Sequence, residues 1–142
     1  MAIAKVASRP CVLIVDDDEI ALIAIADLIR EEGFEVRCLT SPVGAADMAE
    51  ADENVAAVVL DLNMPIMRGD NVARVFLSRP GVRNIPLVLL SADTQQVLER
   101  VHRRMPNVEA LSKANMHDTL GPAVRRAIQA RPRHAQRASK WG

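Results

Sequence analysis

Short apolar runs recur along the chain, separated by longer segments in which apolar residues repeat at helical spacing. The runs cover residues 11–15, 36–39, 55–60, 87–90 and, less clearly, 108–111. They contain many β-branched residues and are nearly continuous, which is typical of strands that are covered on both faces. We therefore predict five strands, each followed by a helix.

Helical patterns fill the segments between these strands. Ile20, Ile23 and Leu28 mark the first helix, and Gly33 is its expected stop signal. A second helix is predicted over residues 43–51. The apolar residues of the remaining three helices are Val72, Val75, Phe76, Val97, Val101, Leu120, Val124, Ala127 and Ile128. This alternation predicts an α/β fold with a parallel sheet and right-handed crossovers.

Composition fits one soluble globular domain, since 49% of the 142 residues are hydrophobic and 25% are charged. No apolar run approaches the roughly 20 residues of a membrane span, and the first residues lack the apolar core of a signal peptide. The initiator methionine favours a natural N-terminus. Cys11 and Cys38 fall in predicted strands, so we expect buried, reduced thiols in a cytoplasmic protein.

Charge is unevenly distributed, although the net charge of the chain is zero. No acidic residue follows Asp118, whereas the end of the chain is basic. We expect an N-terminal extension over residues 1–9, one domain over residues 10–130 and a flexible basic tail over residues 131–142. Only 2% of the residues are aromatic, which argues against nucleic-acid binding by base stacking.

Polar side chains follow directly after the predicted strands. They are Asp16, Asp17 and Asp18 after the first strand, Asp61 after the third, Ser91 after the fourth and Lys113 after the fifth. In an open parallel sheet the functional site lies beyond the carboxyl ends of the strands. We therefore expect these side chains to converge on one edge, except Asp18, which is expected only to cap the first helix.

Several carboxylates at one point repel one another, and a hard divalent cation relieves that repulsion. Oxygen ligands without histidine or cysteine favour Mg²⁺ or Mn²⁺. A lysine and a serine nearby would bind a phosphoryl group, and a remaining carboxylate could act as its nucleophile. The constellation predicts phosphoryl transfer to an aspartate.

Four separated stretches, VLIVDDDE, VVLDLNMPIMRGD, PLVLLSAD and LSK, carry a family resemblance. With these motifs the chain resembles the receiver domain of bacterial two-component response regulators, of the chemotaxis-regulator type. The resemblance implies a flavodoxin-like, doubly wound, five-stranded parallel sheet of order 2-1-3-4-5 with five helices. It also implies that Asp61 is phosphorylated by a histidine kinase or a phosphotransfer protein.

The resemblance assigns roles to the site residues as well. Its implied Mg²⁺ ligands are Asp17, Asp61 and the backbone carbonyl of Asn63, with Asp16 acting through water. Ser91 and Lys113 would contact the phosphoryl group and carry the switch. The expected output surface for an unknown partner is the face formed by helix 4, strand 5 and helix 5. The protein would be a signalling switch that catalyses its own phosphorylation and dephosphorylation, as a monomer or a phosphorylation-dependent dimer, without contacting nucleic acid or membrane.

Two positions depart from the pattern of that family. Ala114 stands where a proline usually follows the lysine in a cis peptide, so we predict either a trans bond with a rearranged loop or an enforced cis bond. Ala110 stands where an aromatic switch residue is usual, so no rotating ring takes part in the switch.

Other functions fit the residues less well. A phosphatase of the haloacid-dehalogenase type needs a general acid two residues after its nucleophile, where this chain has Asn63. An FMN carrier needs a phosphate loop after the first strand, where three aspartates would repel the phosphate. No nucleotide-binding glycine motif is present. The alternatives that stay open are a phosphorylation-independent protein-binding module with a receiver-like fold and the receiver domain of a hybrid histidine kinase.

Overall fold

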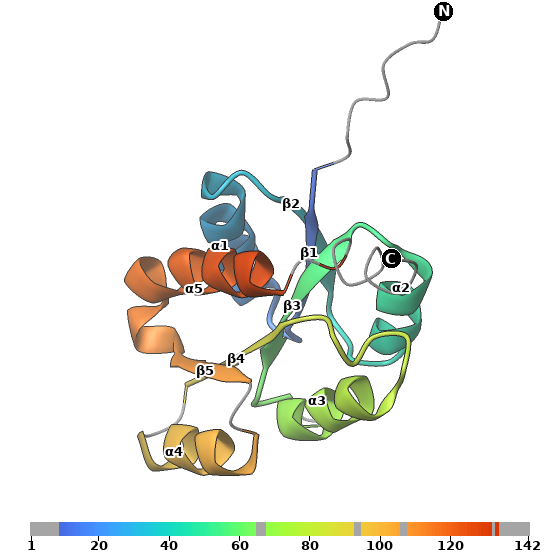
Figure 1. Cartoon of the computed structure of the whole chain (residues 1–142). Coiled ribbons are helices and arrows are strands. Elements are labelled where there is room, and N and C mark those ends of the chain that lie inside the picture. Colours follow the sequence, from blue (N-terminus) through green and yellow to red (C-terminus); the bar gives the residue numbers. More distant parts are fainter. Residues whose placement is uncertain (1–8, 65–67, 93–94, 106–107, 132, 134–142) are drawn as a thin grey trace, which may run out of the picture.

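The fold is a three-layer sandwich with a parallel sheet between two layers of helices (Figure 1). The computed structural model describes residues 9–64, 68–92, 95–105, 108–131 and 133. The strands are β1 (Cys11–Val15), β2 (Glu35–Leu39), β3 (Val55–Asp61), β4 (Leu87–Ser91) and β5 (Glu109–Ser112). The helices are α1 (Glu19–Glu31), α2 (Ala45–Ala51), α3 (Gly69–Ser78), α4 (Gln95–Arg104) and α5 (Met116–Ala130), with the 3₁₀ turn η1 (Lys113–Asn115) before α5.

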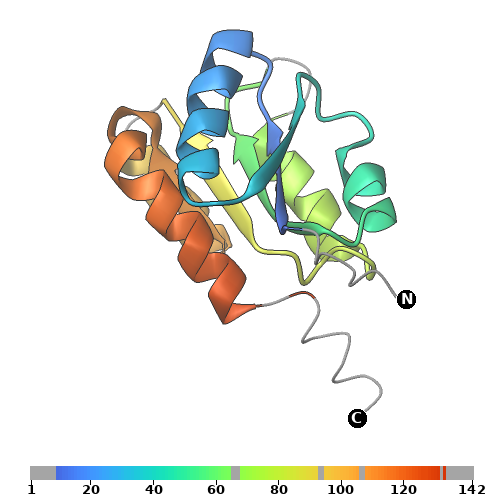
Figure 2. The same ribbon diagram turned by 90° about the horizontal axis from the view of Figure 1, so that it is seen from above.

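All neighbouring strands pair in parallel, in the order β2-β1-β3-β4-β5. This order and the five helices confirm the predicted flavodoxin-like, doubly wound fold. Viewed from above, α1 and α5 lie on one side of the sheet, whereas α2 and α3 lie on the other (Figure 2). Because the crossovers are helical, both faces of the central strands are covered.

Alternate residues of the central strands enter two separate cores. Val12 and Ile14 of β1 pack with apolar residues of α1 and α5. Leu13 and Val15 of the same strand pack with α2, α3 and α4, in a core that includes the fully buried Phe76. All residues of β1, β3 and β4 are buried, as the continuous apolar runs predicted.

Helix α1 begins and ends where the sequence signals indicated. The Asp18 carboxylate accepts the backbone N–H of Ile20, which confirms Asp18 as the N-cap. Gly33, at φ 92°, follows the helix and donates its N–H to the carbonyl of Arg30. Ile20 and Ile23, however, are 79% and 64% exposed, because the buried face is formed by Leu22, Ile25, Ala26 and Ile29.

Two further sequence expectations are wrong in detail. Helix α2 begins at Ala45 rather than at residue 43, because Gly44 has a left-handed backbone that the helix cannot contain. Cys11 is buried as expected, but Cys38 is exposed. Strand β2 lies at the edge of the sheet, so its residues are covered less completely than those of β1. Residues 1–8 and 134–142, which include most of the expected extension and tail, lie outside the described residues.

Candidate functional site

Three carboxylates meet where β1 and β3 end. Asp16 directly follows β1 and is 1% exposed, Asp61 ends β3 and is 3% exposed, and Asp17 is exposed. One oxygen of each carboxylate lies within 4.8 Å of the other two. Since β1 and β3 are parallel neighbours, their carboxyl ends reach the same edge of the sheet, as the sequence predicted.

Lys113 reaches this group from the end of β5. Its Nζ lies 2.9 Å from Asp16 Oδ2 and 3.3 Å from Asp61 Oδ1, so one ammonium group bridges the two buried carboxylates. The described residues contain no cis peptide bond, so Lys113 precedes Ala114 in the trans arrangement, the first of the two predicted alternatives. The Ser112 hydroxyl accepts the N–H of Ala114 and caps the 3₁₀ turn that carries Lys113.

Burial and charge act in opposite directions on this cluster. Burial raises the pKa of Asp61, and the nearby Asp16 charge raises it further, whereas the Asn63 N–H and Lys113 lower it without cancelling the rise. Burial alone would lower the pKa of Lys113, but its hydrogen bond to Asp16 and the charge of Asp61 raise it overall. The lysine is therefore held as the ammonium form beside two crowded carboxylates.

Tight turns fix the directions of the two buried carboxylates. Asp16 Oδ1 accepts the N–H of Asp18 at 2.9 Å, and Asp61 Oδ1 accepts the N–H of Asn63 at 3.0 Å. In each case the acceptor lies two residues before the donor, which is the geometry of an Asx turn. One oxygen of each carboxylate is thus held by the backbone.

Ser91 and Asn63 complete the edge. Ser91 ends β4 and is fully buried, beside β3 in the register that pairs Asp61 with Leu90. The Asn63 side chain is exposed, and its Oδ1 accepts the N–H of Ala92 at 3.3 Å, which joins the loop after β3 to the loop after β4. This hydrogen bond was not predicted from the sequence. The only signal for it was an amide side chain, Asn63, placed soon after a predicted strand.

The donor set matches a hard divalent cation, because it consists of carboxylate oxygens at close range. Asp17 is the exposed member, so the cluster reaches the surface of the molecule through it. Among the described residues, no other group of three or more histidine, cysteine, aspartate and glutamate side chains could hold a metal ion.

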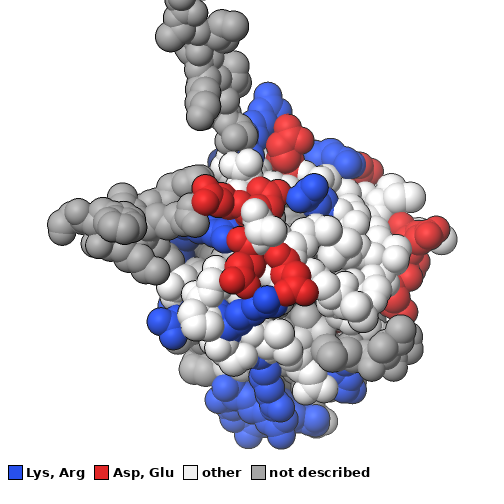
Figure 3. Space-filling view, turned by 90° about the vertical axis from the view of Figure 1, so that its right-hand side faces the viewer, with Lys and Arg blue, Asp and Glu red and all other residues white. Residues whose placement is uncertain are grey.

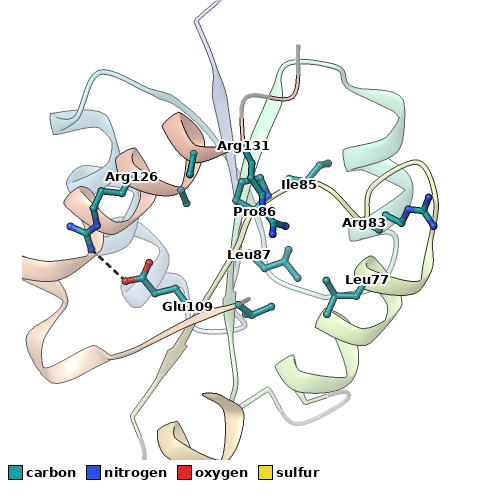
Figure 4. Close-up of a pocket in the computed structure, with 11 residues that line it drawn as sticks. Leu77, Arg83, Ile85, Pro86, Leu87, Glu109, Arg126 and Arg131 are labelled. Atoms are coloured by element: carbon teal, nitrogen blue, oxygen red, sulfur yellow. Dashed lines mark hydrogen bonds and ion pairs between the residues drawn. The ribbon is translucent and has the colours of Figure 1, made fainter. Parts of the chain in front are cut away.

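A separate cavity of about 250 Å³ lies away from this edge, near the beginning of β4 and β5 and the end of α5 (Figure 4). Its lining includes Ile85, Pro86 and Leu87, and Arg126 pairs there with Glu109 at 3.4 Å. None of the carboxylates described above lines it. This cavity is therefore not part of the acidic site.

Comparison with known proteins agrees with the fold. Residues 12–125 match the family described as response regulator receiver domain. The chain belongs to this family. It is a receiver domain of the kind used in two-component signalling, which confirms the resemblance seen in the sequence.

One relative of this receiver domain is the transcriptional regulatory protein PrrA of Mycobacterium tuberculosis, which is 40% identical over 86 residues. That match covers 60% of this chain and 35% of PrrA, so the chain spans about a third of the length of such curated relatives. Among solved structures, a sensor protein from Polaromonas sp. JS666 superposes with a TM-score of 0.77 at 25% identity, covering 86% of this chain and 98% of that one.

A second structure is the receiver domain of the sensor histidine kinase PA1611 from Pseudomonas aeruginosa PAO1, which holds a magnesium ion in its active-site cleft. It superposes on this receiver domain with a TM-score of 0.74 at 21% identity, covering 87% of this chain and 99% of that one. At this identity the likeness shows a shared fold. In the part of the chain that the structure describes, no helix has both the length and the apolar character needed to cross a membrane.

Proposed function

We propose that this receiver domain is a signalling switch that is phosphorylated on Asp61. The observation that carries the proposal is the setting of Asp61, a buried carboxylate at the end of β3 with Lys113 Nζ 3.3 Å away and two further carboxylates within 4.8 Å. Burial keeps competing water away from a nucleophile, and the ammonium group lies where negative charge would accumulate during phosphoryl transfer.

In the proposed reaction a carboxylate oxygen of Asp61 attacks the phosphorus atom of a phosphohistidine. The bond between phosphorus and the imidazole nitrogen breaks, and its electron pair leaves on that nitrogen. The turn that holds Asp61 Oδ1 on the Asn63 N–H orients the carboxylate for this attack. Lys113 offsets the added charge, and the hydroxyl of Ser91 donates a hydrogen bond to a phosphoryl oxygen.

The carboxylates of Asp16, Asp17 and Asp61 and the backbone carbonyl of Asn63 would hold Mg²⁺, with Asp16 acting through water; Mn²⁺ has similar ligand preferences. When bound, the cation would neutralise charge on the carboxylates and on the phosphoryl oxygens. The magnesium ion in the PA1611 receiver domain supports this assignment. The protein's own part is to keep the three carboxylates close together, although they repel one another in the absence of the cation.

The proposed phosphoryl donor is a histidine kinase or a phosphotransfer protein, and the proposed output surface is the face formed by α4, β5 and α5. Ala110 on β5 is 5% exposed and carries no ring, so the signal would pass through displacement of α4 and the loop before it. The domain would act as a monomer, or as a dimer that forms when phosphorylation displaces α4. In a longer chain the same domain could serve a regulator such as PrrA or a hybrid kinase.

The test is the intact mass of the protein after incubation with acetyl phosphate, with and without Mg²⁺. We expect a Mg²⁺-dependent gain of a single phosphoryl group in the wild type and no gain in Asp61→Asn. Asp27→Asn is a matched control, because Asp27 is an exposed carboxylate on α1, paired only with Arg30 at 3.7 Å among the described residues. A gain in Asp61→Asn equal to that of the wild type would contradict the assignment.

The alternative is a receiver-like module that binds partners without phosphorylation. Ala110 and Ala114 support it, because the chain lacks the aromatic switch residue and the proline after the lysine that are usual in the family. No mass gain in the wild type under any condition would favour this second function.

A further inference from the structure

A basic groove separates α3 from α4. It encloses about 250 Å³, and its walls carry Arg68, Arg74, Arg100 and Arg104. None of the described residues that line it is acidic. Figure 3 shows basic side chains gathered at the lower edge of one face of the molecule, apart from the mixed acidic and basic side chains above them.

Three of the four arginines of this groove differ from most other arginines of the fold. Arg79 pairs with Asp47 and Glu50, and Arg125 pairs with Glu32. By contrast, Arg74, Arg100 and Arg104 are exposed and make no hydrogen bond or ion pair within the part of the chain that the structure describes. These three like charges are therefore held close together without a counterion among the described residues.

Helix stability explains only part of this arrangement. Basic side chains in the last turn of α4, such as Arg103 and Arg104, interact favourably with the helix dipole. The dipole of α4 does not explain the presence of Arg74, which lies on α3 and lines the same groove. Nor does it account for Arg100, which precedes the last turn and shares a helical face with Arg104, where like charges repel.

The base of the groove is apolar. Leu62, Val101 and Met105 line it, and each of these side chains is less than 9% exposed. Methionine adapts its shape to different contacts, which suits a floor that receives a side chain from another molecule. None of the described aromatic side chains lines the groove, so a platform for stacking nucleic-acid bases is missing there.

We propose that this groove binds an acidic, amphipathic peptide segment of a partner protein. Carboxylates of the segment would pair with the guanidinium groups on both walls, and an apolar side chain would cover the floor. The groove shares α4 with the proposed output face but contains no residue of β5 or α5. It is therefore a second surface, and its binding can be tested without phosphorylation of Asp61.

The test uses the full chain and a fluorescein-labelled helical peptide of about 15 residues, with glutamate on one face and leucine on the other. Binding is followed by fluorescence polarisation at low and at higher salt, because screening weakens contacts between charges. We expect a dissociation constant of the order of 10–100 μM. Arg100→Gln/Arg104→Gln should weaken binding at least about tenfold, as expected for removal of two charge-assisted contacts.

The matched control is Arg83→Gln/Arg131→Gln, which removes the same charge from two exposed arginines that line the cavity in Figure 4. It should change the affinity less than about twofold. Arg74→Gln tests the opposite wall of the groove and keeps the proposal testable if the double variant does not fold. A peptide with serine in place of leucine should bind at least about tenfold more weakly, because it lacks the apolar contact.

Three results would overturn the proposal. The first is an equal loss of affinity in both double variants, which would indicate attraction by net charge alone. The second is the absence of peptide binding below about 1 mM. The third is tighter binding of a short duplex DNA that is lost in Arg100→Gln/Arg104→Gln, which would make the groove a nucleic-acid site.

Discussion

Asp61 lies in an environment unlike that of an ordinary surface carboxylate. It is 3% exposed, and burial raises its pKa above the usual value of 3.8 despite the hydrogen bond from Asn63 and the charge of Lys113. When the pKa of a carboxyl group is higher in the folded than in the unfolded protein, the free energy of unfolding falls as the pH rises toward that folded-state pKa. The charge of Asp61 therefore opposes folding at neutral pH.

Asp61→Asn should consequently stabilise the protein at pH 7 in the absence of divalent cations. The amide keeps an acceptor for the Asn63 N–H, and Lys113 keeps its contact with Asp16 at 2.9 Å. We expect the unfolding temperature to rise by roughly 2–4 °C, which corresponds to about 1 kcal/mol for a domain of this size.

The difference between variant and wild type should shrink as the pH falls and vanish at about pH 2, well below the unfolded pKa, where the carboxyl group is protonated in both the folded and the unfolded chain. Thermal unfolding followed by circular dichroism between pH 2 and pH 8 measures it, with Asp27→Asn as the control for loss of a surface charge. A wild type that is as stable as Asp61→Asn at pH 7 would mean that Lys113 fully compensates the buried charge.

At the scale of elements, an arginine beyond α5 joins this part of the chain to the sheet. The guanidinium group of Arg133, three residues past α5, donates to the carbonyl of Asp52 at 2.7 Å and to that of Val55 at 3.0 Å. These carbonyls belong to the turn before β3 and to its first residue. The contact therefore fixes α5 against the amino-terminal end of the central strand.

Arg133→Ala should lower the free energy of unfolding by about 1–3 kcal/mol, because two charge-assisted hydrogen bonds are lost and two carbonyls are left without that donor. Urea unfolding monitored by circular dichroism gives the value. Arg131→Ala is the matched control, since Arg131 is exposed and no hydrogen bond or ion pair of its side chain occurs among the described residues. Equal effects of the two substitutions would show that the Arg133 contacts contribute nothing specific.

The elements themselves could be predicted because their signals are local. Continuous apolar runs identified the buried strands, and Asp18 and Gly33 identified the ends of α1. The positions after the strands could be predicted as well, since parallel strands bring their carboxyl ends to one edge. The convergence of Asp16, Asp17, Asp61 and Lys113 followed from that rule.

What could not be predicted depends on neighbours that are distant in sequence. The buried face of α1 excludes Ile20 and Ile23, because the position of the helix on the sheet, and not its own periodicity, decides which residues are covered. Cys38 is exposed because β2 lies at the edge of the sheet. The bond from the Ala92 N–H to Asn63 and the trans turn that presents Lys113 depend on loops that meet only in the folded chain.

At the scale of the whole molecule, the acidic edge links folding to cation binding. The cluster of Asp16, Asp17 and Asp61 exists only when β1 and β3 are paired, so an unfolded chain offers no equivalent site. Any ligand that binds only the folded state stabilises it by an amount that grows with the ratio of its concentration to its dissociation constant. Under the proposed function, stability must therefore depend on the concentration of Mg²⁺.

Adding Mg²⁺ at about 100 times its dissociation constant should stabilise the wild type by about 2.7 kcal/mol, and a chelator should reverse the effect.

Asp17→Asn should strongly reduce this gain in stability. Asp17 is exposed and makes no hydrogen bond or ion pair in the described part of the chain, so the substitution removes no stabilising contact, and the loss of repulsion from the other two carboxylates should raise stability slightly without the cation. Asp118→Asn is the control, because its exposed carboxylate lies in the first turn of α5, outside the acidic cluster. Thermal unfolding across a Mg²⁺ titration measures all three proteins. A gain that is equal in the wild type and in Asp17→Asn would mean that the cation acts elsewhere, and the proposed ligand set would then be wrong even if Asp61 accepts a phosphoryl group.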